Sequence, residues 1–114
     1  MKVYISGPMS NIANWNKPAF QAMADMLRAH GHHPLNPADT RLPSCATWEE
    51  YMRADIRLLM DADAIVLLHG WANSRGACLE CTIARELGFK IFVEEDFIQE
   101  ASAKSGVKGE GLPS

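Results

Sequence analysis

The chain has 114 residues, of which 47% are hydrophobic and 22% charged, a composition typical of one globular domain with a single core. Its formal net charge of -3 gives no electrostatic reason to expect a nucleic-acid polymer or an anionic membrane as a partner. No apolar run approaches the ~20 residues that cross a bilayer, and three cysteines without a framework spacing favour reduced thiols in a cytoplasmic protein.

The first part of the chain alternates strand and helix patterns. Gly7-Pro8 stops the first strand, Asn14 or Asn16 can cap the following helix, and Gly31 ends it. In order, we expect a strand from Lys2 to Ser6, a helix with its apolar stripe at Phe20, Met23, Ala24 and Leu27, a short strand from His32 to Leu35, and a flexible loop from Ala38 to Ala46.

The second part repeats this alternation. Thr47 and Glu50 form a capping-box pattern, in which a side-chain oxygen and a carboxylate exchange bonds with free amides. We expect a helix from there to about Asp61, a buried strand from Ala64 to Leu68, a loop from His69 to Arg75, a helix ending at Gly88, a strand from Lys90 to Val93, and a short helix from Phe97 to Ala103. Repeated βαβ units predict a single α/β domain, residues 1–103, with a parallel sheet of four to five strands and helices on both faces. Residues 104–114 are expected to form a flexible tail.

Two carboxylates occupy positions that the helical periodicity assigns to the apolar side. Glu80 lies three residues after Ala77, and Asp55 lies four residues before Leu59. Taken singly, Glu80 can be a helix-start acid favoured by the dipole, and Asp55 an ion-paired residue at the margin of the stripe. Two acids inside apolar stripes favour a functional role, because burying an unpaired charge is costly.

Residues that follow the strands supply the other candidates, since the carboxyl ends of parallel strands meet at one edge of a sheet. Ser74-Arg75-Gly76 precedes a helix, so free amides, a hydroxyl and a guanidinium can hold a phosphate there. Asp55 reaches this edge only if its helix leans over it. The candidate substrate-binding residues are Ser6, Gly7, Pro8, Met9, His69, Gly70, Trp71, Ser74, Arg75 and Gly76.

Other motifs give no sign of a cofactor or metal. Residues 6–10 lack the GxGxxG pattern of dinucleotide sites. Cys78 and Cys81 have CxxC spacing without a second pair, so small core residues are the favoured interpretation over zinc or redox chemistry. The three tryptophans can stack on a base, although packing is their commoner use.

The ordered motifs resemble the nucleoside 2-deoxyribosyltransferase superfamily and, within it, the small, often phage-encoded members of the DUF4406 family. They are Tyr-Ile-Ser-Gly-Pro-Met, Trp-Asn-Lys-Pro-Ala-Phe, Asn-Pro-Ala, Tyr-Met-Arg-Ala-Asp-Ile and Ser-Arg-Gly-Ala-Cys-Leu-Glu. The resemblance implies a flavodoxin-like, Rossmann-like sheet, a nucleotide or nucleoside as the small-molecule partner, and a homo-oligomer, a dimer or larger, with shared active sites.

The resemblance also implies catalytic roles for Glu80, Asp55 and Tyr4. Glu80 would attack or stabilise C1′ of the sugar, Tyr4 would orient Glu80, and Asp55 would protonate the leaving base. Transferases that act on free nucleosides carry aspartate six residues before this glutamate, whereas the branch that hydrolyses deoxynucleoside 5′-monophosphates carries serine, as Ser74 does here. Pro8 is closer to the transferases. We therefore expect an N-glycosidase or deoxyribosyltransferase-like enzyme acting on a 5′-monophosphate; the alternative is a non-catalytic nucleotide-binding module.

Overall fold

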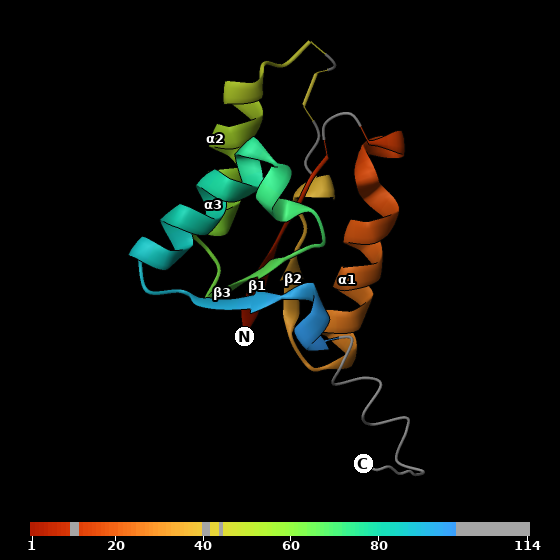
Figure 1. Cartoon of the computed structure of the whole chain (residues 1–114), viewed down its shortest axis with the longest axis vertical. Coiled ribbons are helices and arrows are strands. Elements are labelled where there is room, and N and C mark those ends of the chain that lie inside the picture. The colour runs from red at the N-terminus through yellow and green to blue at the C-terminus, as the bar shows by residue number, and fades with distance from the viewer. Residues whose placement is uncertain (10–11, 40–41, 44, 98–114) are drawn as a thin grey trace.

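The computed structural model describes residues 1–9, 12–39, 42–43 and 45–97, and it has the predicted α/β architecture with one four-stranded parallel sheet (Figure 1). Its strands are β1 (Lys2–Ser6), β2 (His33–Leu35), β3 (Ala64–Leu67) and β4 (Lys90–Val93), and its helices are α1 (Lys17–Ala29), α2 (Trp48–Leu59) and α3 (Arg75–Glu86). Short 3-10 turns occupy Ala13–Asn16, Pro37–Asp39 and Trp71–Asn73.

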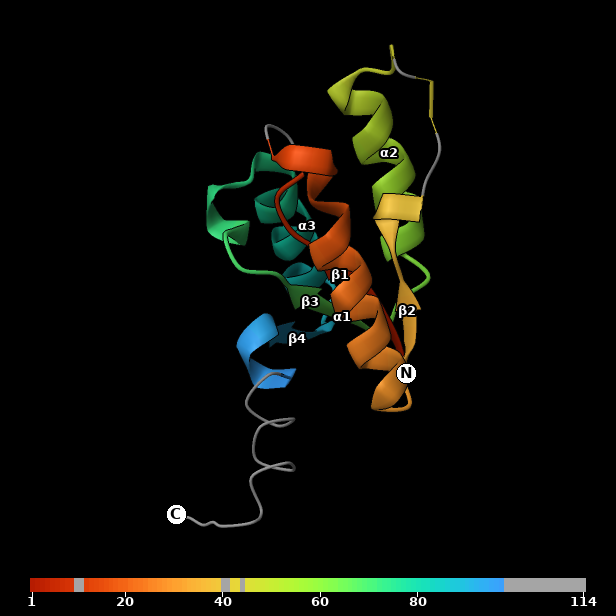
Figure 2. The same cartoon turned by 90° about the vertical axis from the view of Figure 1, so that its right-hand side faces the viewer.

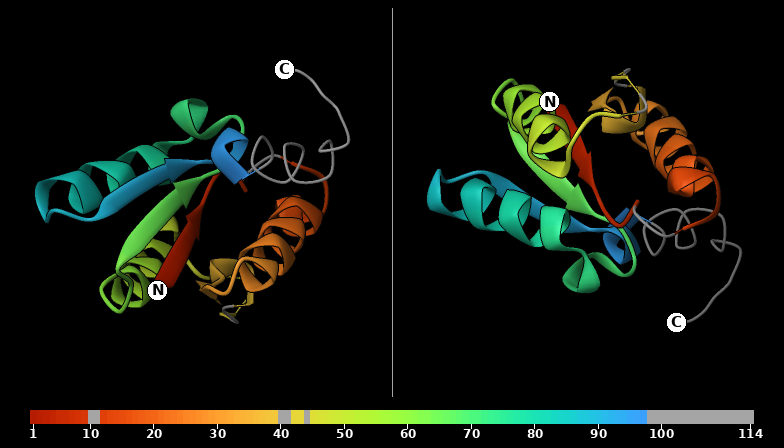
Figure 3. Two further views of the ribbon diagram at one scale, coloured as in Figure 1. Left: turned by 90° about the horizontal axis from the view of Figure 1, so that it is seen from below. Right: turned by 90° about the horizontal axis from the view of Figure 1, so that it is seen from above.

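The strand order is β2-β1-β3-β4, with β1 paired in parallel to both β2 and β3. The chain therefore leaves β1 on one side to form β2 and then crosses to the other side to form β3. Helix α1 covers one face of the sheet, and α2 and α3 cover the other (Figures 1 and 3). In open parallel sheets, such a reversal leaves a crevice at the carboxyl ends of the two central strands, here β1 and β3.

Alternation along β1 divides its side chains between two apolar clusters. Val3 and Ile5 pack in the cluster that contains the α1 residues Phe20 and Leu27, on the face that α1 covers (Figure 2). Tyr4 belongs instead to the cluster beneath α2 and α3, where it meets residues such as Leu59 and Cys81. Because the strand period is two, Ser6 shares this second face with Tyr4.

Side-chain caps form the starts of α2 and α3, whereas the start of α1 lacks one. The predicted capping box is present, because Glu50 N–H donates to Thr47 Oγ1 at 3.1 Å and Thr47 N–H donates to Glu50 Oε1 at 2.7 Å. The predicted side-chain cap of α1 was wrong. Asn16 is the N-cap residue, but its backbone is left-handed and its side chain donates instead to the Pro8 carbonyl at 2.9 Å.

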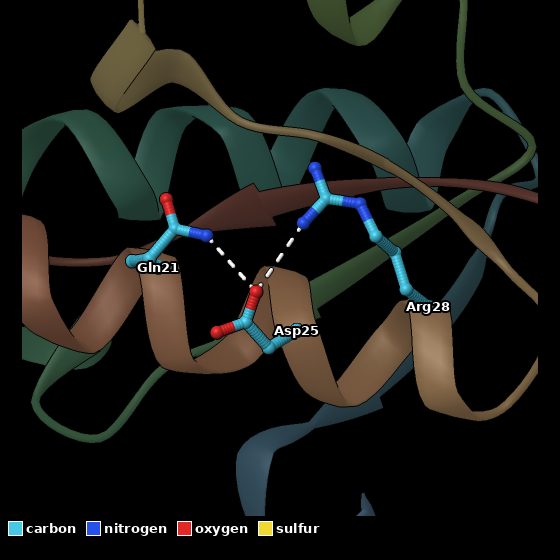
Figure 4. A network of polar contacts seen from close by, with 3 residues as sticks. All are labelled: Gln21, Asp25 and Arg28. Atoms are coloured by element: carbon cyan, nitrogen blue, oxygen red, sulfur yellow. Dashed lines mark hydrogen bonds and ion pairs between the residues drawn. The ribbon is translucent and has the colours of Figure 1, made fainter.

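Helix α1 carries an exposed polar network of Gln21, Asp25 and Arg28 (Figure 4). Asp25 Oδ1 accepts from Gln21 Nε2 at 3.0 Å and from Arg28 at 3.3 Å. These exposed pairs lie at helical spacings of four and three residues, where each contributes only a few tenths of a kcal/mol, about 0.2–0.5. The network is therefore a solvated surface feature.

The end of the chain is described only in part. Residues 94–97 are helical, and Phe97 packs in the α1-side cluster. The rest of the short helix expected from Phe97 to Ala103, the tail expected at 104–114 and the domain boundary between them lie outside the described residues. Within the described part of the chain, no helix is long and apolar enough to cross a membrane.

Candidate active site

A cavity of about 1100 Å³ lies at the carboxyl end of β1, where residues of α1, α2 and α3 all line it. Its walls come from β1 and the loop after it, the start of α1, helix α2 and the start of α3. Pro37, Ala38, Asp39, Leu42 and Ala46 complete them. The position agrees with the crevice expected from the strand order. Tyr4, Asp55 and Glu80, the three predicted catalytic residues, all line this cavity.

Glu80 is held by two hydroxyl groups from β1. Tyr4 Oη donates to Glu80 Oε2 at 2.8 Å, and Ser6 Oγ donates to Glu80 Oε1 at 2.6 Å. The period-two alternation of β1 places both hydroxyls on the face that α3 covers. Glu80 is only 4% exposed, so its carboxylate is fixed in position by one donor on each oxygen.

Burial raises the pKa of Glu80 to about 7, although the hydrogen bonds from Ser6 and Tyr4 act to lower it and the nearby charge of Asp55 acts to raise it. The pKa of Tyr4 lies well above its usual value, first because the ring is buried and then because of the charge of Glu80. Tyr4 therefore keeps its proton and remains a hydrogen-bond donor to Glu80.

Asp55 comes from α2, which leans over the same edge of the sheet. Asp55 is 9% exposed, and desolvation raises the pKa of its carboxyl group to about 7. Among the described residues, none donates a hydrogen bond to Asp55 that would favour its ionised form. The two acids thus differ in environment, because Glu80 has donors that stabilise its negative charge and the described residues supply none to Asp55.

The loop before α3 supplies polar groups at another part of the cavity wall. Ser74 Oγ accepts from Ala77 N–H at 3.2 Å and so caps α3, while its own hydroxyl hydrogen is available to an acceptor. The guanidinium carbon of Arg75 lies 3.7 Å from the centroid of the Trp48 ring. Ser74, Arg75 and Gly76 all line the cavity, and their role in substrate binding stays a prediction.

The remaining predicted binding residues divide into three groups. Gly7, Pro8 and Met9 line the cavity, whereas Ser6 directs its hydroxyl to Glu80. Among the described residues, the cavity walls do not include His69, Gly70 or Trp71. The turn at Trp71–Asn73 packs the Trp71 ring against the apolar cluster beneath α3, and His69 N–H donates to Glu94 Oε1 at 3.0 Å.

The cavity also contains residues that the sequence did not single out as substrate-binding. Trp48, Tyr51 and Met52 line it from α2, and Lys17 and Asn73 line it from other elements. A signal for the first three was present, because Trp48, Tyr51, Met52 and Asp55 recur at the spacing of one helical face.

The cysteines and acids show no metal-binding arrangement in the described part of the chain, where no group of three or more metal-ligating side chains occurs. Cys81 is buried in the cluster beneath α3. The Cys78 thiol lies 3.3 Å from the Ala72 carbonyl oxygen. Cys81 therefore lies in the core, as expected for both cysteines, whereas Cys78 is only half-buried.

Comparisons with known proteins identify a family and a shared fold. A family model described as "Domain of unknown function (DUF4406)" matches residues 1–93. Among solved structures, the 2-deoxyribosyltransferase of Bacillus psychrosaccharolyticus superposes with a TM-score of 0.65 and 19% sequence identity, covering 82% of this chain and 71% of that chain. A search of the curated proteins gives no match. At this identity, the structural likeness establishes a shared fold.

Proposed function

Because the chain belongs to the DUF4406 family and shares the fold of a 2-deoxyribosyltransferase, we propose that it cleaves the N-glycosidic bond of a nucleoside 5′-monophosphate. The observation that carries this proposal is the position of Glu80. A buried carboxylate that two hydroxyls hold at the wall of a large cavity is suited to meet the positive charge that develops at C1′.

The proposed first step uses both acids. A Glu80 oxygen forms a bond to C1′ while the bond between C1′ and the base nitrogen breaks, and the electron pair of that bond passes to the base. Asp55 gives its proton to the base as it leaves. Each oxygen of Glu80 accepts one hydrogen bond and retains a lone pair for this attack.

The second step releases the sugar. A water molecule attacks C1′ and gives a proton to the Asp55 carboxylate, and the bond between C1′ and Glu80 breaks with its electron pair returning to Glu80. The products are the free base and the 5′-phosphorylated sugar. A second base in place of water gives transfer; we favour hydrolysis.

The protonation states required for this sequence fit the two environments. Burial places the pKa values of both acids at about 7, so near neutral pH the pair readily holds one proton. We assign that proton to Asp55, because the hydrogen bonds from Tyr4 and Ser6 can stabilise an ionised Glu80 and, among the described residues, Asp55 receives no such bond. Glu80 is then the nucleophile, and Asp55 is the general acid.

The 5′-phosphate is assigned to the start of α3. An anion there meets the positive end of the helix dipole and the hydroxyl of Ser74. Arg75 adds a positive charge on the same wall. An aspartate at position 74 would repel a phosphate dianion, whereas a serine hydroxyl can donate to it.

We also propose that the protein is a homo-oligomer in which a second subunit completes each active site. Trp15 is 60% exposed and Tyr51 is 37% exposed, and both line the cavity. A neighbouring subunit at this opening would shield both rings from water. Light scattering at the assay concentration is expected to show a dimer or larger assembly, and a monomer would contradict this part of the proposal.

The test of the activity is a substrate panel. Wild type and Glu80→Gln are incubated with each deoxynucleoside 5′-monophosphate, each ribonucleotide and each free nucleoside, with and without an added acceptor base, and free base is measured by chromatography. We expect base release from 5′-monophosphates by wild type and none by the variant.

Two other outcomes would contradict the proposal. Ligand-induced thermal stabilisation without turnover of any substrate would identify a binding module that recognises nucleotides. Neither turnover nor stabilisation would leave the cavity without a nucleotide ligand.

A further inference from the structure

The side chain of Arg75 is placed by an aromatic ring. Its guanidinium carbon lies 3.7 Å from the centroid of the Trp48 ring, and both residues line the cavity. Arg75 is the first residue of α3 and Trp48 the first of α2, so the contact joins the starts of the two helices. A guanidinium over an aromatic face is attracted by the ring, and the contact restricts the rotamers of a long side chain.

Arg75 has no acidic partner in the described part of the chain, where the one ion pair is between Arg28 and Asp25. Stacking on an indole uses the face of a guanidinium and leaves the N–H groups at its edge free to donate. Arg75 therefore presents a positive charge to a cavity that contains two buried acids, Asp55 and Glu80. This arrangement suits an anionic group of the ligand.

Gly76 allows the two helix starts to approach this closely. A Cβ added at Gly76 would lie 3.0 Å from Met52 Sδ and 3.9 Å from Trp48 Nε1. A Cβ there would therefore require the flexible end of Met52 to shift slightly, so Gly76 leaves room for the starts of α2 and α3 to pack closely.

We propose that Trp48 is a positioning residue that holds Arg75 in place as the receptor for the 5′-phosphate, and that the pair sets the preference for nucleotides over nucleosides. The proposal rests on the function proposed above and adds the group that determines its substrate class. In free solvent, a flexible arginine loses rotamer entropy when it binds a phosphate. Because Trp48 already restricts the rotamers of Arg75 in the free protein, part of this entropy is lost before the ligand binds. The effect of Trp48 is therefore expected in KM of the nucleotide.

The test compares a deoxynucleoside 5′-monophosphate with the matching deoxynucleoside. We measure kcat and KM for both substrates with wild type, Trp48→Leu, Trp48→Phe, Arg75→Ala, Arg75→Lys and the double variant Trp48→Leu/Arg75→Ala. The readout is the ratio of kcat/KM for the nucleotide to kcat/KM for the nucleoside. Arg85→Ala is the matched control, because it removes the same charge from the exposed end of α3.

Trp48→Leu is expected to lower this ratio about threefold to tenfold through KM of the nucleotide, as loss of a cation–π contact predicts. Trp48→Phe keeps an aromatic face and should retain most of the wild-type ratio. Arg75→Ala should lower the ratio at least about tenfold, and Arg85→Ala should leave it unchanged. In the double variant, the loss of Trp48 should have no further effect on the ratio, because its action passes through Arg75.

An unchanged ratio in Trp48→Leu overturns the inference. The inference is also overturned if Trp48→Leu lowers the ratio as much in the Arg75→Ala background as it does in wild type, because Trp48 would then act independently of Arg75. Where circular dichroism shows that Trp48→Leu does not fold, Arg75→Lys decides: it keeps the charge but lacks the guanidinium plane, so a wild-type ratio in this variant overturns the inference.

Failure of the proposed function gives a different result, since no variant then releases base from any substrate. The inference is in that case decided by dissociation constants for the nucleotide and the nucleoside, measured by calorimetry on the same variants. The preference for the nucleotide, now the ratio of the two dissociation constants, is expected to change in each variant as described for kcat/KM. Equal affinity of wild type for the nucleotide and the nucleoside overturns it.

Discussion

Ser6 donates its hydroxyl hydrogen to Oε1 of Glu80 over 2.6 Å, which joins the end of β1 to the second turn of α3. Removing this bond by Ser6→Ala is expected to raise the pKa of Glu80, because the bond favours the ionised form. Since Glu80 must be ionised to attack C1′, the acidic limb of the kcat/KM profile should move to higher pH. Tyr4→Phe should have the same direction of effect.

This pH profile is measured by base release from about pH 5 to about pH 9. Thr82→Ala is the matched control, because Thr82 donates its hydroxyl within α3 to the Cys78 carbonyl and its removal leaves Glu80 untouched. A limb that stays at the wild-type pH in both Ser6→Ala and Tyr4→Phe would show that these bonds do not tune Glu80.

Glu80→Gln is expected to abolish most base release while leaving the protein folded. Loss of a catalytic nucleophile costs several powers of ten in kcat, of order a thousandfold or more. The amide is close in shape to the carboxyl and carries no charge that burial would penalise. Thermal unfolding near pH 8 should therefore show a stability equal to or above that of wild type, and a strongly destabilised variant would refute this account of the buried acid.

The loss of activity caused by Asp55→Asn is expected to depend on the base that leaves. A residue that protonates the departing base contributes about a hundredfold to ten-thousandfold to the rate, and its contribution shrinks when the base leaves readily without a proton. The variant should therefore lose more activity with ordinary bases than with an activated, electron-poor base. Single-turnover rates for the two kinds of substrate test this expectation, and equal losses would remove Asp55 from the role of general acid.

Folding stability is expected to decrease as pH rises from about 4 to about 7. In the folded state, burial places the pKa values of Asp55 and Glu80 at about 7, above their ordinary values of 3.8 and 4.5. Between these limits the folded protein binds more protons than the unfolded chain, so the two acids destabilise the fold progressively. A tenfold change in a proton-binding constant corresponds to about 1.4 kcal/mol. Each acid is therefore expected to lower the free energy of unfolding by on the order of a few kcal/mol across this pH range.

The contribution of these two acids is isolated by comparing urea unfolding of wild type with that of Asp55→Asn/Glu80→Gln across this pH range. The difference in unfolding free energy between the two proteins should grow with pH in favour of the variant. A constant difference would show that neither acid has a raised pKa in the folded state.

Gly7→Ala is expected to destabilise the protein. A Cβ at position 7 would lie 2.7 Å from Leu68 Cβ, an atom next to the backbone at the end of β3 that cannot rotate away, so overpacking of about 1–3 kcal/mol results. Gly76→Ala is the comparison, because its Cβ meets the flexible end of Met52 and should cost less. Chemical denaturation of both variants measures this order, and the reverse order would contradict it.

Local patterns in the sequence already identified much of the site. The apolar stripes of two helices showed that Glu80 and Asp55 lie on the inner side, and the structure finds both buried. The alternation of β1 assigns Tyr4 and Ser6 to one face, although the sequence reading used Ser6 only as a binding residue. The resemblance to DUF4406 and to the deoxyribosyltransferase fold is confirmed by the comparisons.

The local sequence pattern did not predict how the loop after β3 and the start of α1 pack. His69, Gly70 and Trp71 follow a buried strand and were expected to face the ligand, yet the turn they enter packs Trp71 on the core. Asn16 stands at the start of α1 but bonds to Pro8 rather than capping its helix. In both cases, the outcome depends on partners elsewhere in the fold.

The sequence by itself determined which side chains face inward, because the periods of helix and strand are properties of the backbone and appear in any short segment. The tertiary structure alone decided that those side chains meet. The strand order β2-β1-β3-β4 depends on pairing between segments far apart in the chain, and it brings α2 and α3 to the same face of β1. This long-range arrangement, set by packing rather than by local preference, places Asp55 at the wall of the same cavity as the carboxylate that Tyr4 and Ser6 hold.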